Sequence, residues 1–251
     1  MIDSHTHLDS CAPANDELVG NARAAGIRRI LTVGLDVENS RRALIAGETF
    51  DEVHVAVGWH PNAADGYDEA AGAGLRELAR HPRCAAIGET GLDYFRDSAQ
   101  PDAQRIAFLD QLAIAREVDK PVVIHTRAAE EDTIATLREH AEGLTVIIHC
   151  FSMPDRLQEC LDAGWMISFA GNVTYPKNAD LAAAAAVVPD DRILVETDAP
   201  YLTPQSRRRE RNEPAYVTET AQFVAEQRGQ SYDELDALVT ANAERIFGWG
   251  A

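Results

Sequence analysis

Short, continuously apolar segments recur along the chain at intervals of roughly 20 to 35 residues. They do not alternate apolar with polar positions, and a continuous apolar pattern is typical of parallel strands that are covered on both faces. The pattern predicts eight strands, at Ile2–His5, Arg29–Val33, His54–Gly58, Cys84–Gly88, Val122–His125, Thr145–His149, Met166–Phe169 and Ile193–Glu196.

The segments between and after these strands are amphipathic or alanine-rich, which predicts helices. These helices are expected at Asp16–Ala25, Ser40–Thr49, Gly74–His81, Asp102–Val118, Glu130–His140, Asp155–Ala163, Tyr216–Arg228 and Asp233–Phe247, and the Ala182–Ala186 tract predicts a further, closely packed helix surface. Eight strand–helix units in 251 residues predict one α/β domain over residues 1–251, a (β/α)₈ barrel of the TIM type. An open doubly wound sheet is the weaker alternative.

The amino-acid composition limits the class of protein and is consistent with the predicted barrel. Apolar residues make up 45% of the chain and charged residues 25%, as in ordinary globular domains. The chain has no apolar run of 18 residues and no N-terminal export signal, so we expect a cytoplasmic protein that does not associate with membranes. The four cysteines lack CxxC spacing, which favours free thiols in a reducing compartment.

The net charge restricts the class of partner. The chain carries 41 acidic and 23 basic residues, a formal charge of −18 at pH 7. Such a surface repels polyanions and argues against tight, non-specific binding to duplex DNA. A nucleic-acid substrate would therefore have to be held by metal ions and a local basic patch.

Candidate metal ligands lie at or just beyond the carboxyl ends of the predicted strands. They are His5, His7, His60, Glu89, His125, His149 and Asp198. The carboxyl ends of barrel strands surround one cavity, where the active sites of this architecture lie, so we expect these side chains to meet. His54, His81 and His140 lie elsewhere and are interpreted as surface or packing residues.

Neutral imidazole together with carboxylate suits Zn²⁺, Mn²⁺ or Mg²⁺. Even six of these seven candidates are too many ligands for one tetrahedral ion, but they suit two divalent ions that share a carboxylate. Glu89 is the best bridging candidate because it lies between the two groups of ligands in strand order. A binuclear site lowers the pKa of a bound water and stabilises charge on the leaving oxygen. Asp198 is the candidate to take the proton from that water, so the residues predict metal-assisted hydrolysis.

Six ordered motifs carry a family resemblance that runs from residue 1 nearly to the end of the chain. They are Asp3-Ser4-His5-Thr6-His7-Leu8-Asp9, Gly58-Trp59-His60-Pro61, Ile87-Gly88-Glu89-Thr90-Gly91-Leu92-Asp93-Tyr94, Pro121-Val122-Val123-Ile124-His125-Thr126-Arg127, His149-Cys150-Phe151-Ser152 and Glu196-Thr197-Asp198-Ala199-Pro200-Tyr201-Leu202. With these motifs the chain resembles the TatD family of metal-dependent deoxyribonucleases, within the amidohydrolase-like hydrolases.

The resemblance implies a (β/α)₈ barrel with a two-metal site that hydrolyses DNA phosphodiester bonds through a metal-bridged hydroxide, as a 3′ exonuclease. Carried over by position, it gives one ion His5, His7, Glu89 and Asp198, and the second ion Glu89, His125 and His149. Glu89 and Asp198 then have the catalytic roles. His60 and Arg127 would lie near the substrate phosphate, with His60 as a further ligand the alternative, and Asp93 and Tyr94 could orient ligands.

Further residues are candidates for contact with the substrate. The segment 206–211 is richer in arginine than the usual family loop, and Arg207 is expected to hold a phosphate backbone, the alternative being an exposed basic turn. Tyr201, like Trp59 and Tyr94, lies close to the motifs and is an aromatic candidate. We expect DNA as the substrate, single-stranded or at frayed ends, and no obligate protein partner.

Two rival functions use the same residues. The first is a binuclear hydrolase of a small ester, lactone, amide or D-aminoacyl ester on tRNA, since one nucleophile can attack carbon or phosphorus. The second is a metal-stabilised binding protein, which would leave Asp198 and the open rim without a role.

Overall fold

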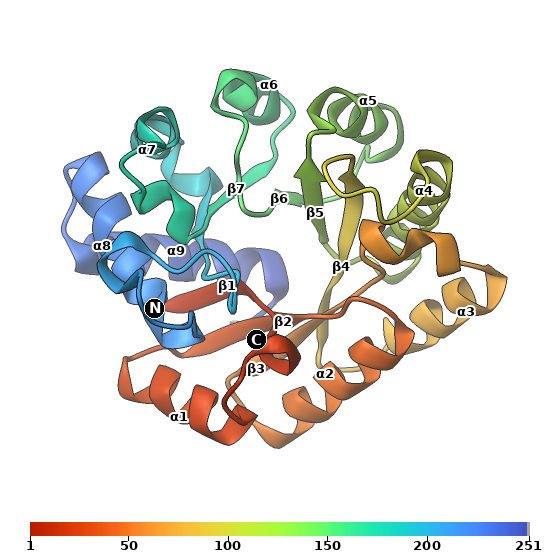
Figure 1. Cartoon of the computed structure of the whole chain (residues 1–251), viewed down its shortest axis with the longest axis horizontal. Coiled ribbons are helices and arrows are strands. Elements are labelled where there is room, and N and C mark those ends of the chain that lie inside the picture. Colours follow the sequence, from red (N-terminus) through yellow and green to blue (C-terminus); the bar gives the residue numbers. More distant parts are fainter. Residues whose placement is uncertain (250–251) are drawn as a thin grey trace.

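Eight parallel strands form a nearly closed barrel in the computed structural model, which describes residues 1–249 (Figure 1). The strands are β1 Ile2–Thr6, β2 Arg29–Val33, β3 Val53–Val57, β4 Cys84–Asp93, β5 Val122–Arg127, β6 Val146–Ile148, β7 Met166–Phe169 and β8 Ile193–Val195. Each strand pairs with the next in chain order, from β1 to β8. This arrangement confirms the predicted (β/α)₈ barrel and excludes the open doubly wound sheet, in which the strand order would reverse.

The first and last strands close the barrel through the residues that follow β8. Thr6 and Ala199 form a parallel bridge, and the backbone N–H of His7 donates to the carbonyl oxygen of Ala199 at 2.8 Å. The N–H of Asp198 donates to the carbonyl oxygen of His5 at 2.9 Å. Closure therefore places the end of the chain's last strand beside its first histidines.

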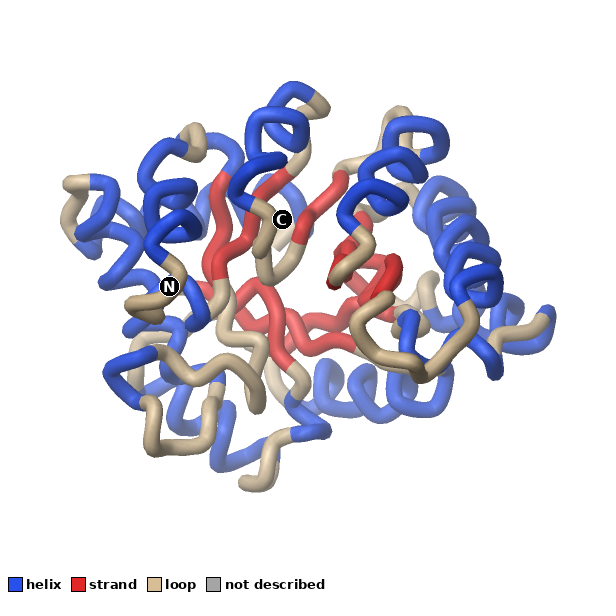
Figure 2. The backbone as a smooth tube through the Cα atoms, turned by 45° about the horizontal axis from the view of Figure 1, so that its top comes forward, coloured by secondary structure: helices blue, strands red, loops and turns tan. Residues whose placement is uncertain are grey.

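Helices surround the strands on the outside (Figure 2). They are α1 Asn15–Ala24, α2 Val37–Thr49, α3 Glu69–Leu78, α4 Pro101–Val118, α5 Glu130–His140, α6 Leu157–Asp162, α7 Ala179–Val187, α8 Val217–Arg228 and α9 Tyr232–Phe247. One helix follows each of the first seven strands, and α8 and α9 complete the ring after β8. Within residues 1–249, no helix has both the length and the apolar character needed to span a bilayer.

Several elements begin or end at other residues than expected, and two of them, α3 and β4, differ most. The helix expected at Gly74–His81 is α3, which begins earlier because the Asp68 carboxylate accepts the backbone N–H of Ala71 and caps its N-terminus. The strand expected to end at Gly88 continues to Asp93. Gly91 permits this, because a Cβ atom there would lie 2.0 Å from the carbonyl oxygen of His125 on the neighbouring strand. Glu89 therefore lies within a strand and not after it.

The two ends of the strands differ in character. Fully buried apolar side chains such as those of Ile30, Val55 and Ile167 form the core. Buried polar side chains are concentrated toward the carboxyl ends, among them His5, Glu89 and Glu196. The four cysteines, Cys11, Cys84, Cys150 and Cys160, form no disulfide, as expected. The apolar part supports the barrel, and the polar end forms the site.

Candidate metal centre

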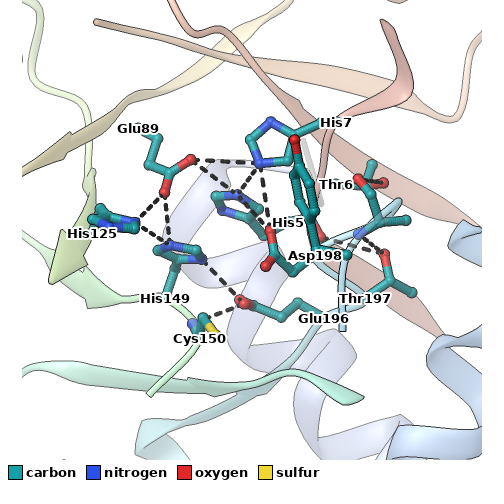
Figure 3. Close-up of polar contacts among 12 residues, drawn as sticks. His5, Thr6, His7, Glu89, His125, His149, Cys150, Glu196, Thr197 and Asp198 are labelled. Atoms are coloured by element: carbon teal, nitrogen blue, oxygen red, sulfur yellow. Dashed lines mark hydrogen bonds and ion pairs between the residues drawn. The ribbon is translucent and has the colours of Figure 1, made fainter. Parts of the chain in front are cut away.

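The seven candidate ligands gather at the carboxyl end of the barrel. His5 lies on β1, Glu89 on β4 and His125 on β5, whereas His7, His60, His149 and Asp198 follow β1, β3, β6 and β8. The close-up in Figure 3 shows Glu89 between two pairs of histidines. His54 lies apart from this cluster, with its ring centroid 5.2 Å from that of Trp249.

One half of the cluster is built around β1. The Nε2 atoms of His5 and His7 lie 3.3 Å apart, and each is 3.5 Å from Oε2 of Glu89. Oδ1 of Asp198 lies 3.8 Å from the Nε2 of His5 and 3.4 Å from that of His7. Ligand atoms about 2.0–2.2 Å from one ion have mutual distances of this order. The four side chains therefore face a common point.

The other half involves β5 and the end of β6. Nδ1 of His125 lies 2.7 Å and Nε2 of His149 lies 2.8 Å from Oε1 of Glu89, and the two nitrogens are 3.4 Å apart. The two oxygens of Glu89 thus face different histidine pairs. This is the geometry that a carboxylate needs in order to bridge two ions.

Two buried carboxylates lie behind the second pair. Oδ2 of Asp93 is 3.2 Å from Nε2 of His125, and Oε1 of Glu196 is 3.2 Å from Nδ1 of His149. Each carboxylate accepts the ring N–H and so leaves the other ring nitrogen available as a ligand. The sequence patterns did not identify Glu196 as a site residue, although an acidic residue at the end of an apolar strand was a signal for it.

Unpartnered buried atoms test whether a cation fits the cluster. Oε2 of Glu89 is buried and has no hydrogen-bond donor in the described part of the chain, although it lies near two imidazole nitrogens. Leaving a buried carboxylate oxygen without a partner costs free energy, and a cation at the shared point would offset that cost. Histidine and carboxylate are also the donor types that divalent metal ions take. The cluster can therefore hold divalent metal ions.

The charges of the ligands depend on one another. Burial lowers the pKa of His5, which favours the neutral, ligating imidazole. Although burial opposes ionisation, His149 and His60 hold the pKa of Glu89 well below its usual range. Burial likewise opposes the cation of His149, yet Glu89 and Glu196 raise its pKa well above the usual range. A metal ion must therefore displace a proton at His149, and metal binding weakens as the pH falls.

A buried aspartate connects the first histidines to Asp198. Oδ1 of Asp3 accepts the backbone N–H of Thr197 at 2.9 Å, and Oδ2 accepts the Thr197 hydroxyl at 2.6 Å. Asp3 therefore connects β1 to the segment that carries Asp198, a role that no sequence pattern indicated.

His60 differs from the other four histidines. Its Nδ1 accepts the backbone N–H of Asn62 at 3.0 Å, so the neutral ring carries its proton on Nε2. That nitrogen lies 3.6 Å from Oε1 of Glu89. Because Nε2 carries the proton, this tautomer favours a role for His60 as a hydrogen-bond donor toward the site and not as a metal ligand through Nε2.

An open cavity of about 760 Å³ lies above the cluster. Arg127 and Tyr201, both predicted to contact substrate, line it, as does Arg96. Arg207 is not among the lining residues. Its Nε lies 3.1 Å from Oε1 of Glu219 and its Nη1 lies 3.4 Å from Oε1 of Glu210.

Comparisons with known proteins agree with this arrangement. The family model described as TatD related DNase matches residues 2–248. A metal-dependent hydrolase of Mycobacterium tuberculosis named TatD is 39% identical over 260 residues, covering 100% of this chain and 98% of its own length. A Klebsiella pneumoniae protein named 3′-5′ ssDNA/RNA exonuclease TatD is 35% identical, covering 93% of this chain and 92% of its own length.

Solved structures also resemble this chain. The TatD homologue YjjV of Escherichia coli K12 superposes with a TM-score of 0.92 at 26% identity, over 99% of this chain and 98% of its own. A phosphotriesterase homology protein of Escherichia coli, solved with phosphate in its active site, has a TM-score of 0.70 at 15% identity, a likeness of fold alone. By its family match, its relatives and its cluster of histidines and carboxylates, the chain belongs to the TatD family of metal-dependent hydrolases.

Proposed function

We propose that this protein is a two-metal exonuclease that removes nucleotides from the 3′ end of single-stranded DNA. The observation that carries the proposal is Glu89, whose two oxygens face separate histidine pairs at the base of an open cavity. Several relatives are named 3′-5′ ssDNA/RNA exonuclease TatD, which supports the choice of substrate and adds RNA to the candidates. Mg²⁺, Mn²⁺ and Zn²⁺ are the candidate ions.

The assignment of ligands follows the two halves of the cluster. His5, His7 and Asp198 would hold one ion, His125 and His149 the other, and Glu89 would bridge them. Bound there, the ions would lower the pKa of water and stabilise negative charge on the phosphate.

The chain's own residues supply the remaining chemistry. Although burial opposes ionisation, His7 and His149 lower the pKa of Asp198, which keeps the carboxylate able to accept a proton from the attacking water. His60 directs its Nε2–H toward the same site and can donate to a phosphate oxygen. Arg127 lines the cavity and carries the charge needed to hold a phosphodiester.

Arg207 has a weaker case as a phosphate contact. Its guanidinium is exposed and already paired with Glu219 and Glu210, so a phosphate would have to compete with both carboxylates. The predicted role of Arg207 requires that these pairs exchange for substrate.

A panel of labelled substrates tests the proposal. The protein is stripped with a chelator, reloaded with Mg²⁺, Mn²⁺ or Zn²⁺, and given 5′-labelled single-stranded DNA, the same DNA as a blunt duplex, RNA, a lactone and a D-aminoacyl-tRNA. A ladder that shortens from the 3′ end, fastest for the single strand and absent in Asp198→Asn, is expected. Turnover of the lactone or of the aminoacyl ester, without cleavage of any nucleic acid, would replace the proposal with the rival hydrolase.

A further inference from the structure

An exposed aromatic residue, Phe95, lies just after β4. It is not among the residues that line the cavity, but Arg96, which follows it in the chain, and Arg127, which contacts its ring, both line the cavity. Asp93 pairs in register with Arg127 of β5, and the N–H of Tyr94 donates to the carbonyl oxygen of Arg127 at 2.9 Å. Phe95 follows, and it is 65% exposed. Burying that apolar surface would be favourable, and a site beside a cavity offers a ligand the opportunity to bury it.

The position of Phe95 is fixed by the carboxylate that also orients a candidate metal ligand. Oδ1 of Asp93 accepts the backbone N–H groups of Phe95 at 3.0 Å and Arg96 at 3.1 Å. Oδ2 of the same carboxylate lies 3.2 Å from Nε2 of His125. The aromatic residue is therefore held in a set relation to the metal centre, as a specific subsite requires.

Cationic groups accompany the ring. The guanidinium carbon of Arg127 lies 3.8 Å from the centroid of the Phe95 ring, a cation–π contact. Arg127 and Arg96 both line the cavity. Across residues 1–249 neither side chain has an ion-pair or hydrogen-bond partner, although acidic residues exceed basic ones by 18. Their N–H groups remain available to an anion.

We infer that Phe95 is the stacking platform for a base that flanks the scissile phosphodiester, with Arg96 and Arg127 holding the adjacent phosphate. A planar apolar ring that contacts Arg127, with the cavity-lining Arg96 next in the chain, matches a nucleotide, which combines a planar base with an anionic phosphate. A base inside a duplex is paired and stacked on its neighbours, so the platform selects single strands and frayed ends. This inference rests on the proposed function and assigns its base subsite.

Kinetics on a single-stranded oligonucleotide test the platform with three substitutions of Phe95. Phe95→Ala and Phe95→Leu should raise KM by roughly 5- to 100-fold with little change in kcat, because base–aromatic stacking is lost. Phe95→Trp should keep KM near the wild-type value. Ile106→Ala, on an equally exposed apolar residue of α4, is the matched control and should leave KM unchanged.

Abasic oligonucleotides show whether a base is the ligand. Two substrates are compared, one with an abasic unit at the terminal position and one with it at the penultimate position. The substrate that lacks the stacked base should bind equally weakly to wild type and to Phe95→Ala. Arg96→Gln should lower the slope of log KM against log salt concentration by about 0.7, the value of one phosphate contact on a single strand.

The outcomes separate the two claims. If the wild type cleaves the oligonucleotide and Phe95→Ala matches it, the platform is refuted and the exonuclease proposal stands. If Phe95→Ala is impaired equally on intact and on both abasic substrates, the ring has only a structural role and the platform is again refuted. If the wild type cleaves no nucleic acid, both claims are overturned.

Discussion

The two histidine pairs of the metal centre are held in different ways. His125 and His149 each contact a buried carboxylate with the ring nitrogen that faces away from Glu89. Among residues 1–249, His5 and His7 have no such partner, and their buried Nδ1 atoms have no hydrogen bond. The backbone bonds that close the barrel and the contact of Asp3 with Thr197 position the first pair instead.

This contrast separates two physical tasks. In the second half, local acid–histidine contacts select the tautomer and increase the basicity of the ligand. In the first half, strand closure selects the position, so the site depends on the integrity of the fold. Substitutions in the two halves should therefore damage different properties, the metal affinity in one and the stability in the other.

The largest effect is expected at Glu89, the residue common to both halves. Glu89→Gln removes the charge that faces both histidine pairs, and an electrostatic contribution of several kcal/mol corresponds to a fall in kcat on the order of 10³-fold. Elemental analysis after equilibration with Mn²⁺ should show that the content of bound metal falls. Glu139→Gln, on the exposed side of α5, is the control. A Glu89→Gln variant that keeps its metal and its turnover would contradict the bridging role.

Glu196→Gln tests the second half alone. His149 and the backbone N–H of Cys150 contact the same oxygen, Oε1, at 3.2 and 2.8 Å, so the amide oxygen of Gln can keep both hydrogen bonds and the substitution removes only the negative charge behind His149. Loss of the carboxylate partner of a ligating histidine lowers metal affinity by about 10- to 100-fold. Titration calorimetry with Mn²⁺ should show weaker binding, while the melting temperature changes little. An unchanged affinity would mean that His149 is oriented by packing alone.

Asp3→Asn tests the first half. The carboxylate accepts two hydrogen bonds from Thr197, and an amide group can accept only through its single oxygen. A lost buried hydrogen bond costs about 1–3 kcal/mol, so urea denaturation should show a less stable protein. If Asp3→Asn retains full stability and loses only metal affinity, the first half controls the same property as the second, and the contrast between the two halves is wrong.

His60→Gln separates a substrate contact from a ligand. A hydrogen bond to a charged oxygen contributes about 1.5 kcal/mol or more, so kcat/KM should fall roughly tenfold. Metal content should stay at the wild-type level, because the proton-bearing Nε2 does not ligate. Loss of metal in this variant would instead assign His60 to the inner ligand set.

The smallest effect is expected at His54, which has arginine side chains nearby where the histidines of the metal centre have carboxylates. Burial, with Arg83 and Arg29 nearby, lowers the pKa of His54 from 6.5 to about 4. The folded protein then binds fewer protons than the unfolded chain between these values, so this contribution to stability is complete above pH 6.5 and is lost as the pH falls toward 4. Because the ring is partly exposed, we expect only about 1 kcal/mol. The difference in unfolding free energy between pH 7 and pH 5 should shrink by that amount in His54→Phe.

Periodicity and motif spacing were sufficient to predict the barrel. Continuous apolar segments with helices between them determine a parallel sheet, because both faces of each strand must be buried. The strand-end positions of His5, Glu89 and Asp198 then predict a common cavity, since the barrel brings these ends together. The boundaries of α3 and β4 were less predictable, because a cap at Asp68 and a close approach at Gly91 decided them.

The sequence by itself therefore determined the fold class and the set of residues that meet, because residue type and period follow from burial and metal chemistry. Only the tertiary structure decided how they meet. It placed the two oxygens of Glu89 against different histidine pairs, and Asp93 and Glu196 behind one pair only. It also left Arg127 beside Phe95 and paired Arg207 with Glu219. These choices depend on contacts between residues far apart in the chain, which no local pattern encodes.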